Sequence, residues 1–203
     1  EQTENGVWVI HSPIGSYQLK TTLVGKHNVA NVLAATAAGV AMGIEILDIA
    51  RAIESVEPVK GRLNFIRGVK GTLVIDDTYN ANPASLEAAI DVLSHQKGKR
   101  LLVVGDMAEL GEDAESIHSR VGEMAKHAGV NSLFAYGEIS QATVNAFGEN
   151  GFFFENQEEL IEAVSEQIGG DVSVLIKGSR AMKMERVVQA LSDSNNNNNG
   201  QDL

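Results

Sequence analysis

The 203-residue sequence contains no cysteine, no long apolar run and no cluster of lysine or arginine. Without cysteine the chain can form neither disulfides nor thiolate metal sites, which fits a cytoplasmic protein. Because no stretch of about 18 apolar residues occurs and the sequence does not open on a basic-then-apolar leader, we expect neither a membrane-spanning helix nor a signal peptide. The formal net charge is −11, and the lack of a basic footprint argues against nucleic acid or an anionic membrane as a partner.

Familiar nucleotide and metal signatures are also missing. The five histidines include no HxH or HxxxH pair, so we expect no zinc site and no metal ligands in this chain. GxGxxG follows none of the expected strands, and Gly105–Gly111 has the wrong spacing for a dinucleotide fingerprint. The Walker A pattern GxxxxGK[ST] is absent as well. We therefore do not expect the chain to cradle a triphosphate on its own.

From Arg62 onward, strand-like and helical patterns alternate, which predicts an α/β fold with a mainly parallel sheet covered on both faces. Leu101–Val104 and Val172–Ile176 are mostly apolar without alternation, as central strands should be. The first two strands, joined at Gly68–Gly71, predict one antiparallel edge strand. The predicted strands are 63–67, 72–77, 100–105, 131–136, 152–154 and 172–177, and the predicted helices 84–95, 114–128, 138–148, 157–168 and 180–191.

The residues before this region predict a β-hairpin and two helices. Val7–Ile10 and Tyr17–Leu19 are strand-like around a turn at 12–16. Val29–Met42 is so rich in alanine that we expect a helix buried nearly all round, and Ile44–Val56 is amphipathic. We interpret this part as the end of a domain that begins outside the chain. Further boundaries come from composition: a linker at 57–61, and a polar, low-complexity tail at 192–203 that we expect to be disordered.

Three polar loops follow the ends of predicted strands: Asp76–Asn82, Gly105–Gly111 and Lys177–Arg180. Such loops meet at the carboxyl edge of an open α/β sheet, where ligands bind. Capping and turn chemistry could explain any one of them; Asn82, for example, precedes Pro83 and suits the N-cap of the next helix. The three together favour a binding site.

Alternatives remain open for several of these residues. The carboxylates and amines of the loops also mimic the acidic pocket of a response-regulator receiver, with Asp76, Asp77, Asp106 and Lys177. Receivers place proline after that lysine, where this chain has Gly178. A surface salt bridge is the alternative for Arg62, and helix capping is the alternative for the polar group His27, Asn28 and Asn31.

The order of five motifs resembles the Mur ligases: GKHNVAN, GRL, DDTYNANP, GDMAELG with a later His118, and KGSRAMKME. The match runs from about residue 20 to residue 191. YNANP and GDMAELG are similar to the member that adds the terminal dipeptide of the peptidoglycan stem, rather than to members that add single amino acids. The resemblance implies that 62–191 is the Rossmann-like C-terminal domain and that 1–61 is the end of the central ATPase domain.

The implied activity is ATP-dependent amide-bond formation through an acyl phosphate, adding D-alanyl-D-alanine to UDP-N-acetylmuramoyl-tripeptide. The implied cofactors are ATP and Mg²⁺, with the P-loop and the magnesium ligands in a part of the ligase that this sequence lacks. We expect the ligase to be a cytoplasmic monomer and this chain to be inactive on its own. The alternative is a stand-alone ligand-binding or interaction module of the same fold.

The resemblance also implies roles for residues at matching positions. Asn28 and Asn31, with His27 beside them, would contact the adenine side of ATP, and Arg62 its phosphates. Asp77 would accept hydrogen bonds from the ribose, with Asp76 as the less favoured alternative. Arg62 and Lys177 are the candidate catalytic residues. The acyl-phosphate and dipeptide side would be lined by Tyr79, Asn80, Asn82, Asp106, Glu109, Ser179 and Arg180.

Overall fold

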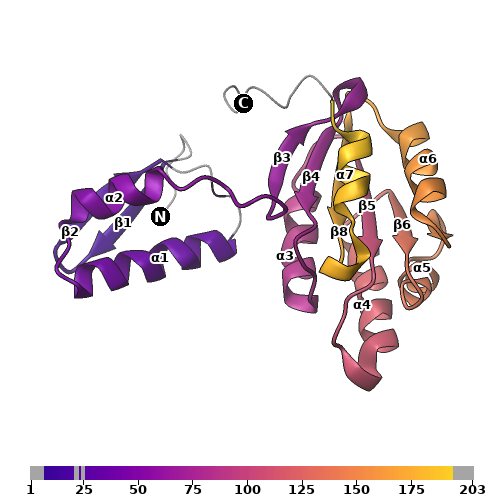
Figure 1. Ribbon diagram of the computed structural model, residues 1–203, viewed down its shortest axis with the longest axis horizontal. Coiled ribbons are helices and arrows are strands. Elements are labelled where there is room, and N and C mark those ends of the chain that lie inside the picture. Colours follow the sequence, from indigo (N-terminus) through magenta and orange to yellow (C-terminus); the bar gives the residue numbers. More distant parts are fainter. Residues whose placement is uncertain (1–6, 21–22, 24–25, 194–203) are drawn as a thin grey trace. The chain divides into compact units, whose positions relative to one another are not determined.

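The computed structural model describes residues 7–20, 23 and 26–193, apart from the side chains of Lys26 and His27. The chain divides into two compact units, Glu1–Val59 and Lys60–Leu203 (Figure 1). The division falls within the segment that its composition marks as a linker. Residues 194–203 of the predicted disordered tail lie outside the described residues. The assignment of the first unit to the end of an ATPase domain stays a prediction.

The first unit is a hairpin packed with two helices. Strands β1 (Trp8–Ser12) and β2 (Gly15–Leu19) pair antiparallel, as predicted. Helices α1 (Lys26–Ala41) and α2 (Ile46–Glu54) follow, and α2 buries the predicted apolar face. A small core results, formed by Ile10, Tyr17, Leu19, Val32, Ile49, Ala50 and Ile53.

Helix α1 corrects one expectation, because it is not buried all round. Among its described side chains only Val32, Thr36 and Gly39, on one face, are buried, while Leu33 is 47% exposed. Within the described part of this unit, the hairpin and α2 are the elements that can cover α1. An alanine-rich helix has no polar face to mark its solvent side, so its composition alone suggested more burial than the fold provides.

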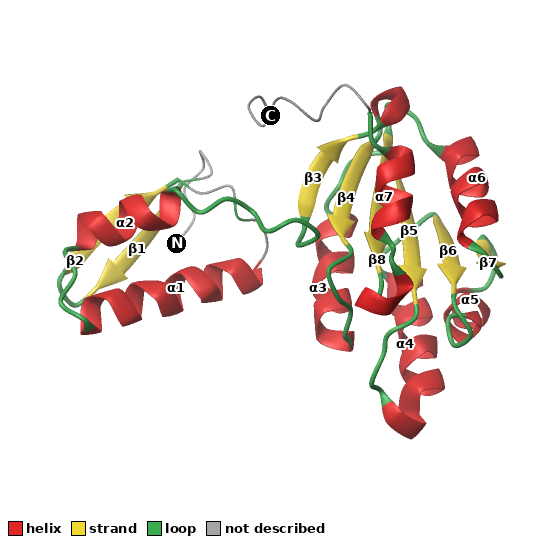
Figure 2. Ribbon diagram, in the orientation of Figure 1, coloured by secondary structure: helices red, strands yellow, loops and turns green. Residues whose placement is uncertain are grey.

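The second unit contains a six-stranded sheet with the order β3-β4-β8-β5-β6-β7. In Figures 1 and 2 the edge strand β3 runs opposite to its neighbour β4, and the remaining pairs are parallel. The predicted mainly parallel sheet with one antiparallel edge strand is therefore confirmed. The strands are β3 (Asn64–Arg67), β4 (Leu73–Asp77), β5 (Lys99–Gly105), β6 (Ser132–Tyr136), β7 (Gly151–Phe154) and β8 (Val172–Lys177).

Helices cover both faces of this sheet, each over its own apolar core. One face carries α3 (Pro83–Ser94), α4 (Ala114–His127) and α5 (Gln141–Phe147), and the other carries α6 (Gln157–Gln167) and α7 (Glu185–Leu191). The adjacent strands β5 and β8 lie at the centre of the sheet between the two cores. In the described part of the chain, no helix has the length and apolar character that crossing a membrane requires.

Two helices begin later than predicted, for tertiary reasons. Helix α5 starts at Gln141 rather than 138, because the amides of Ile139 and Ser140 bind the carboxylate of Asp106. Helix α7 starts at Glu185 rather than 180, since a short 3₁₀ turn at 180–182 ends at Lys183 in the left-handed region (φ 50°).

Candidate functional site

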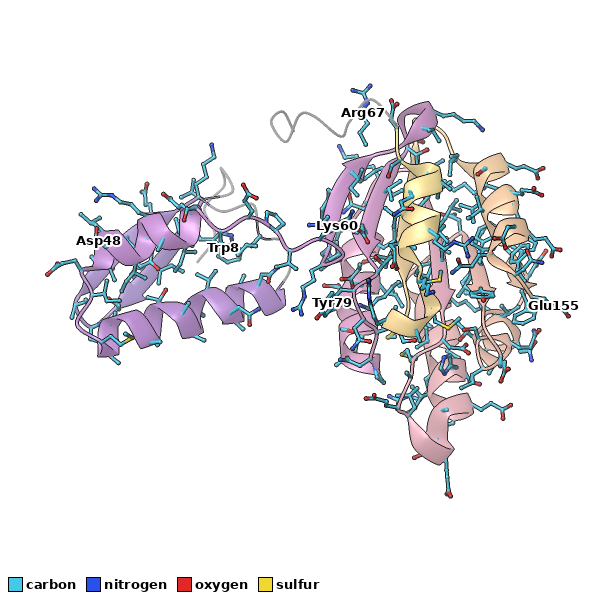
Figure 3. The ribbon with its side chains drawn as sticks, viewed as in Figure 1. Trp8, Asp48, Lys60, Arg67, Tyr79 and Glu155 are labelled. Carbon is cyan, nitrogen blue, oxygen red and sulfur yellow. The ribbon has the colours of Figure 1, made fainter. Side chains whose placement is uncertain are left out.

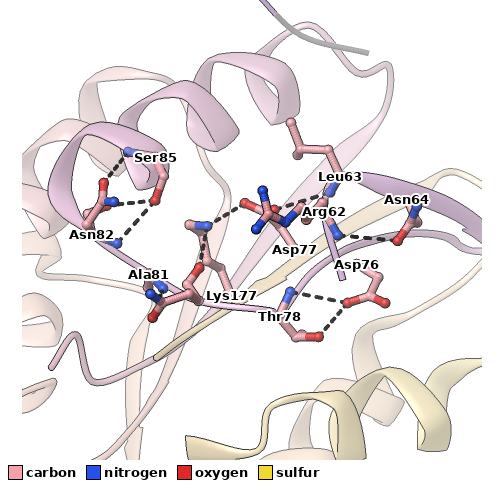
Figure 4. Close-up of polar contacts among 11 residues, drawn as sticks. Arg62, Leu63, Asn64, Asp76, Asp77, Thr78, Ala81, Asn82, Ser85 and Lys177 are labelled. Carbon is pink, nitrogen blue, oxygen red and sulfur yellow. Dashed lines mark hydrogen bonds and ion pairs between the residues drawn. The ribbon is translucent and has the colours of Figure 1, made fainter. Parts of the chain in front are cut away.

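The three polar loops lie on one edge of the sheet because their strands are neighbours. Asp77, at the end of β4, stands opposite Lys177 at the end of β8. The Lys177 ammonium donates to Asp77 Oδ2 at 2.5 Å and to the carbonyl oxygen of Asn80 at 2.9 Å (Figure 4). The Ser179 amide donates to the carbonyl oxygen of Asp106 at 2.9 Å. We call this set of loops the carboxyl-edge rim.

Lys177 is a buried residue of the rim and does not face solvent. Its side chain is 2% exposed, and its ammonium binds two groups that belong to the segment 77–80 at the end of β4. A buried lysine of this kind needs a paired carboxylate, since an unpaired buried charge is costly. The direct effect of Lys177 is to fix Asp77 and the backbone at Asn80. Its predicted catalytic role stays a prediction.

Asp77 keeps accepting capacity beyond these contacts. Its Oδ1 accepts a hydrogen bond from the Leu63 amide at 3.2 Å, and its Oδ2 binds Lys177. A carboxylate offers about four lone-pair positions, so two remain for another donor. The side chain is 12% exposed, so a ligand hydroxyl could reach it.

Asp76 serves the turn that follows β4. Its side chain is 1% exposed, and Oδ1 accepts from both the amide and the hydroxyl of Thr78. This arrangement is an Asx-type turn, in which the carboxylate organises the backbone two residues on. Since Asp77 is the more accessible carboxylate, the geometry supports it over Asp76 as the ligand-binding residue.

Arg62, which precedes β3, and Tyr79 of the rim form an exposed pair. The Arg62 guanidinium carbon lies 4.5 Å from the centroid of the Tyr79 ring, within cation–π range. The Tyr79 amide donates to the carbonyl oxygen of Gly61 at 3.0 Å. A Cβ at Gly61, whose φ is 77°, would lie 2.9 Å from the Tyr79 nitrogen, so glycine is needed for this approach.

The two asparagines of the loop after β4 are both engaged locally. The Asn82 side chain accepts from the Ser85 amide and the Ser85 hydroxyl accepts from the Asn82 amide, forming the N-cap that the sequence predicts for α3. The Asn80 side chain accepts from the Ala81 amide at 2.9 Å. Both residues are exposed, so their predicted part in substrate binding stays open.

The carboxylate of Asp106 ties the loop after β5 to the loop after β6. It accepts from the amides of Ile139 and Ser140 and from the Ser140 hydroxyl. The His118 ring lies behind it, with Nε2 accepting from the Met107 amide and Nδ1 donating to a carbonyl. Sequence reasoning missed Ser140, because nothing local marks it as a partner of Asp106.

The remaining rim residues differ in accessibility. Ser179 is buried, whereas Arg180 is exposed and forms an ion pair with Glu185 at 3.3 Å. Glu109 is exposed and has a φ of 62°. Among the described non-glycine residues with a left-handed φ, only Glu109 lies within a rim loop.

The receiver alternative is wrong. Lys177 pairs with Asp77 alone among the three aspartates, Asp76 serves its own turn, and Asp106 binds the loop after β6. Among the described residues, no group of three acidic, histidine or cysteine side chains could hold a metal ion. The acidic pocket of a receiver is therefore not assembled here.

In the first unit, Asn28 borders a shallow apolar depression with room for little more than one water molecule. The Asn31 side-chain amide donates to Asn28 Oδ1 at 3.5 Å, which joins two side chains within α1, and the helix-cap alternative stays a prediction. The side chain of His27 lies outside the described residues. The depression is otherwise lined by Trp8, Ile10, Leu19, Leu23, Val29 and Val32.

Comparison with known proteins agrees with this architecture. The family model described as Mur ligase, glutamate ligase domain, matches residues 61–180. This chain belongs to the Mur ligase family. Among individual proteins it is similar to the UDP-N-acetylmuramoyl-tripeptide–D-alanyl-D-alanine ligase of Escherichia coli, with 39% identity over 92% of this chain and 42% of that protein. The ligase of the same name from Haemophilus influenzae is 38% identical over 94% of this chain and 43% of that protein.

Solved structures give the same result. A MurF structure from Acinetobacter baumannii superposes with a TM-score of 0.82 at 34% identity, covering 90% of this chain and 41% of that one. A MurF ligase from Thermotoga maritima, solved in complex with ADP, shares the fold with a TM-score of 0.77 at 24% identity, covering 91% of this chain and 42% of that one. The chain thus spans about two-fifths of the length of the relatives it matches.

Proposed function

We propose that this chain forms part of an ATP-dependent ligase that joins D-alanyl-D-alanine to UDP-N-acetylmuramoyl-tripeptide in peptidoglycan synthesis. Family membership supports the ligase class, and relatives that carry this name support the substrates. The observation that carries the proposal is the hydrogen bond in Figure 4 from the Leu63 amide to Asp77 Oδ1, which holds the residue next to Arg62 at the end of β4. Arg62 offers a cation for phosphate oxygens and Asp77 an acceptor for ribose hydroxyls, on two backbone segments that this bond joins.

In the proposed reaction, a carboxylate oxygen of the tripeptide attacks the γ-phosphorus of ATP and ADP leaves. The amine of the dipeptide then attacks the acyl carbon, and inorganic phosphate leaves with the electrons of the carbon–oxygen bond. Such chemistry depends on positioning and charge neutralisation. The Arg62 guanidinium would bind phosphate oxygens through two parallel N–H donors, which is the strong mode for this side chain.

The other residues are assigned either to the nucleotide side or to the dipeptide side of the site. We propose Asp77 as the ribose acceptor and Lys177 as the residue that holds it in place. The adenine contact proposed for Asn28 rests on similarity to the relatives alone. We propose that the dipeptide contacts the exposed residues Tyr79, Asn80, Asn82, Glu109 and Arg180. Asp106 and Ser179 would hold the backbone of the neighbouring loops in place. Nothing in the described residues specifically favours the stand-alone module.

ATP requires Mg²⁺ in this chemistry, to neutralise and orient its phosphates. Among the described residues, no group of three or more histidine, cysteine or acidic side chains could hold a metal ion. We place the magnesium ligands and the P-loop in the part of the ligase that relatives possess beyond the matched region.

The test is the Arg62→Ala variant in the full-length ligase. We expect the KM for ATP to rise about tenfold or more, because a charge-assisted hydrogen bond contributes about 1.5–3 kcal/mol. The exposed side chain carries no ion pair among the described residues, so thermal unfolding should not change. Arg120→Ala, another exposed arginine on α4, is the matched control. An unchanged KM for ATP in Arg62→Ala would refute the phosphate assignment.

A further inference from the structure

Tyr79 has a position that its predicted contact with substrate does not explain. Its ring lies beneath the Arg62 guanidinium at 4.5 Å, although the side chain is 48% exposed and labelled at the surface of the second unit in Figure 3. An exposed tyrosine on a mobile loop would have no fixed relation to an exposed arginine. Here both side chains project from backbone segments that are joined to each other.

Two hydrogen bonds join these segments on either side of Arg62. The Tyr79 amide binds the carbonyl oxygen of Gly61, one residue before the arginine. The Leu63 amide, one residue after it, binds Asp77 Oδ1. Leu63 adopts a left-handed φ of 51°, and the buried Lys177 holds Asp77 from the other side. The backbone at Arg62 is therefore fixed before any ligand arrives.

The contact with the Tyr79 ring uses none of the five N–H donors of the guanidinium as a hydrogen bond to a protein acceptor among the described residues. Among the described residues, no carboxylate forms an ion pair with Arg62, in contrast to Arg180, which Glu185 engages. A stacked and unpaired guanidinium presents two parallel donors to an incoming anion without a search among rotamers.

We infer that Tyr79 is a positioning residue for Arg62, so that its ring, rather than its hydroxyl, contributes to binding the phosphates of the nucleotide. The identity of the ligand as a nucleotide rests on the proposed function. The pairing of Tyr79 with Arg62 rests on the geometry alone. An exposed cation–π contact of this kind corresponds to a two- to fivefold effect on affinity, roughly. The phenol hydroxyl is dispensable for this role.

The pairing is tested first without any ligand, by NMR of the chain. The ring current of Tyr79 should move the Arg62 side-chain protons upfield of their random-coil positions. Tyr79→Phe should keep these shifts and Tyr79→Leu should abolish them. Random-coil positions in the unmodified chain, or shifts that survive in Tyr79→Leu, would overturn the inference whatever the protein binds.

The functional test is a double-mutant cycle in the full-length ligase, with ADP as the probe. We expect Tyr79→Leu to weaken ADP binding two- to fivefold, roughly, and to have no further effect once Arg62 is alanine. Phe152→Leu, which removes another exposed ring from the same unit, is the control expected to leave affinity unchanged. Equal losses from Tyr79→Leu in both backgrounds would overturn the positioning role. Unchanged ADP binding in Arg62→Ala would instead refute the phosphate assignment, while the ligand-free shifts still decide the pairing.

Discussion

Replacing Lys177 by methionine tests the buried ion pair at the centre of the rim. The substitution removes the ammonium but keeps an unbranched side chain of similar length. It leaves the Asp77 carboxylate, 12% exposed, without its cation, and the carbonyl oxygen of Asn80 without its donor. Breaking a buried pair from one side costs about 3–5 kcal/mol. Because Asp77 keeps some contact with water, we expect a loss of about 3 kcal/mol, at the lower end of that range.

The loss should be visible in urea unfolding followed by circular dichroism. The single tryptophan, Trp8, lies in the first unit, so its fluorescence does not report directly on this pair. For a unit of this size, roughly 3 kcal/mol corresponds to a fall in Tm of about 10 °C. Lys97→Met, at an exposed lysine, is the matched control and should change stability by less than about 0.5 kcal/mol.

The double variant Asp77→Asn with Lys177→Met separates the charge effect from packing. Asparagine still accepts from the Leu63 amide but leaves no buried charge, so most of the lost stability should return. A loss below about 1 kcal/mol in Lys177→Met, or strictly additive effects of the two substitutions, would refute the idea that these groups are coupled.

Other predictions concern the surroundings of the rim and an exposed carboxylate on α6. Gly178→Ala would place a Cβ 2.7 Å from the Met184 side chain, so we expect a loss of about 1–3 kcal/mol in urea unfolding, and wild-type stability would contradict this contact. Asp106→Ala removes the acceptor that holds the loop after β6, so the amides of Ile139 and Ser140 should exchange with solvent much faster; unchanged exchange would contradict that role. A backbone hydrogen bond, with help from Arg186, lowers the pKa of Glu158, so Arg186→Gln should raise that pKa in an NMR titration. A depressed pKa in the folded state gives stability that is present at neutral pH and lost as pH falls through the carboxylate range, so the substitution should slightly flatten the acid limb of the stability profile. A Glu158 titration that does not move would count against the ion pair.

The strands were predictable because continuous apolar runs marked them, and α3 because Asn82-Pro83 marks its start. Tertiary contacts determine the boundaries that the sequence did not predict. The start of α5 depends on Asp106, more than thirty residues earlier in the chain, and no local pattern encodes it. Helix α1 was misjudged because alanine does not distinguish a buried face from an exposed one.

For the site, the sequence placed Asp77 and Lys177 on one edge but could not pair them. That pairing depends on β8 lying next to β4, a strand order that the sequence does not reveal. The stacking of Arg62 on Tyr79 was hidden for a similar reason, since the antiparallel return of β3 is what brings their two segments together. The residue types of the three loops predicted the carboxyl-edge rim. The contacts between its residues depend on the strand order and could be assigned only from the fold.

The most direct test of the central claim is an amide-shift titration of the full-length ligase with Mg-ATP, run in parallel on its Arg62→Ala variant. We predict shifts centred on 61–63 and 77–80 in the unmodified ligase, and much smaller ones in the variant. D-Ala-D-Ala in a separate titration should move the exposed dipeptide side instead. No shift at the carboxyl-edge rim with millimolar Mg-ATP, or equal shifts in Arg62→Ala, would contradict the claim that this edge binds the nucleotide.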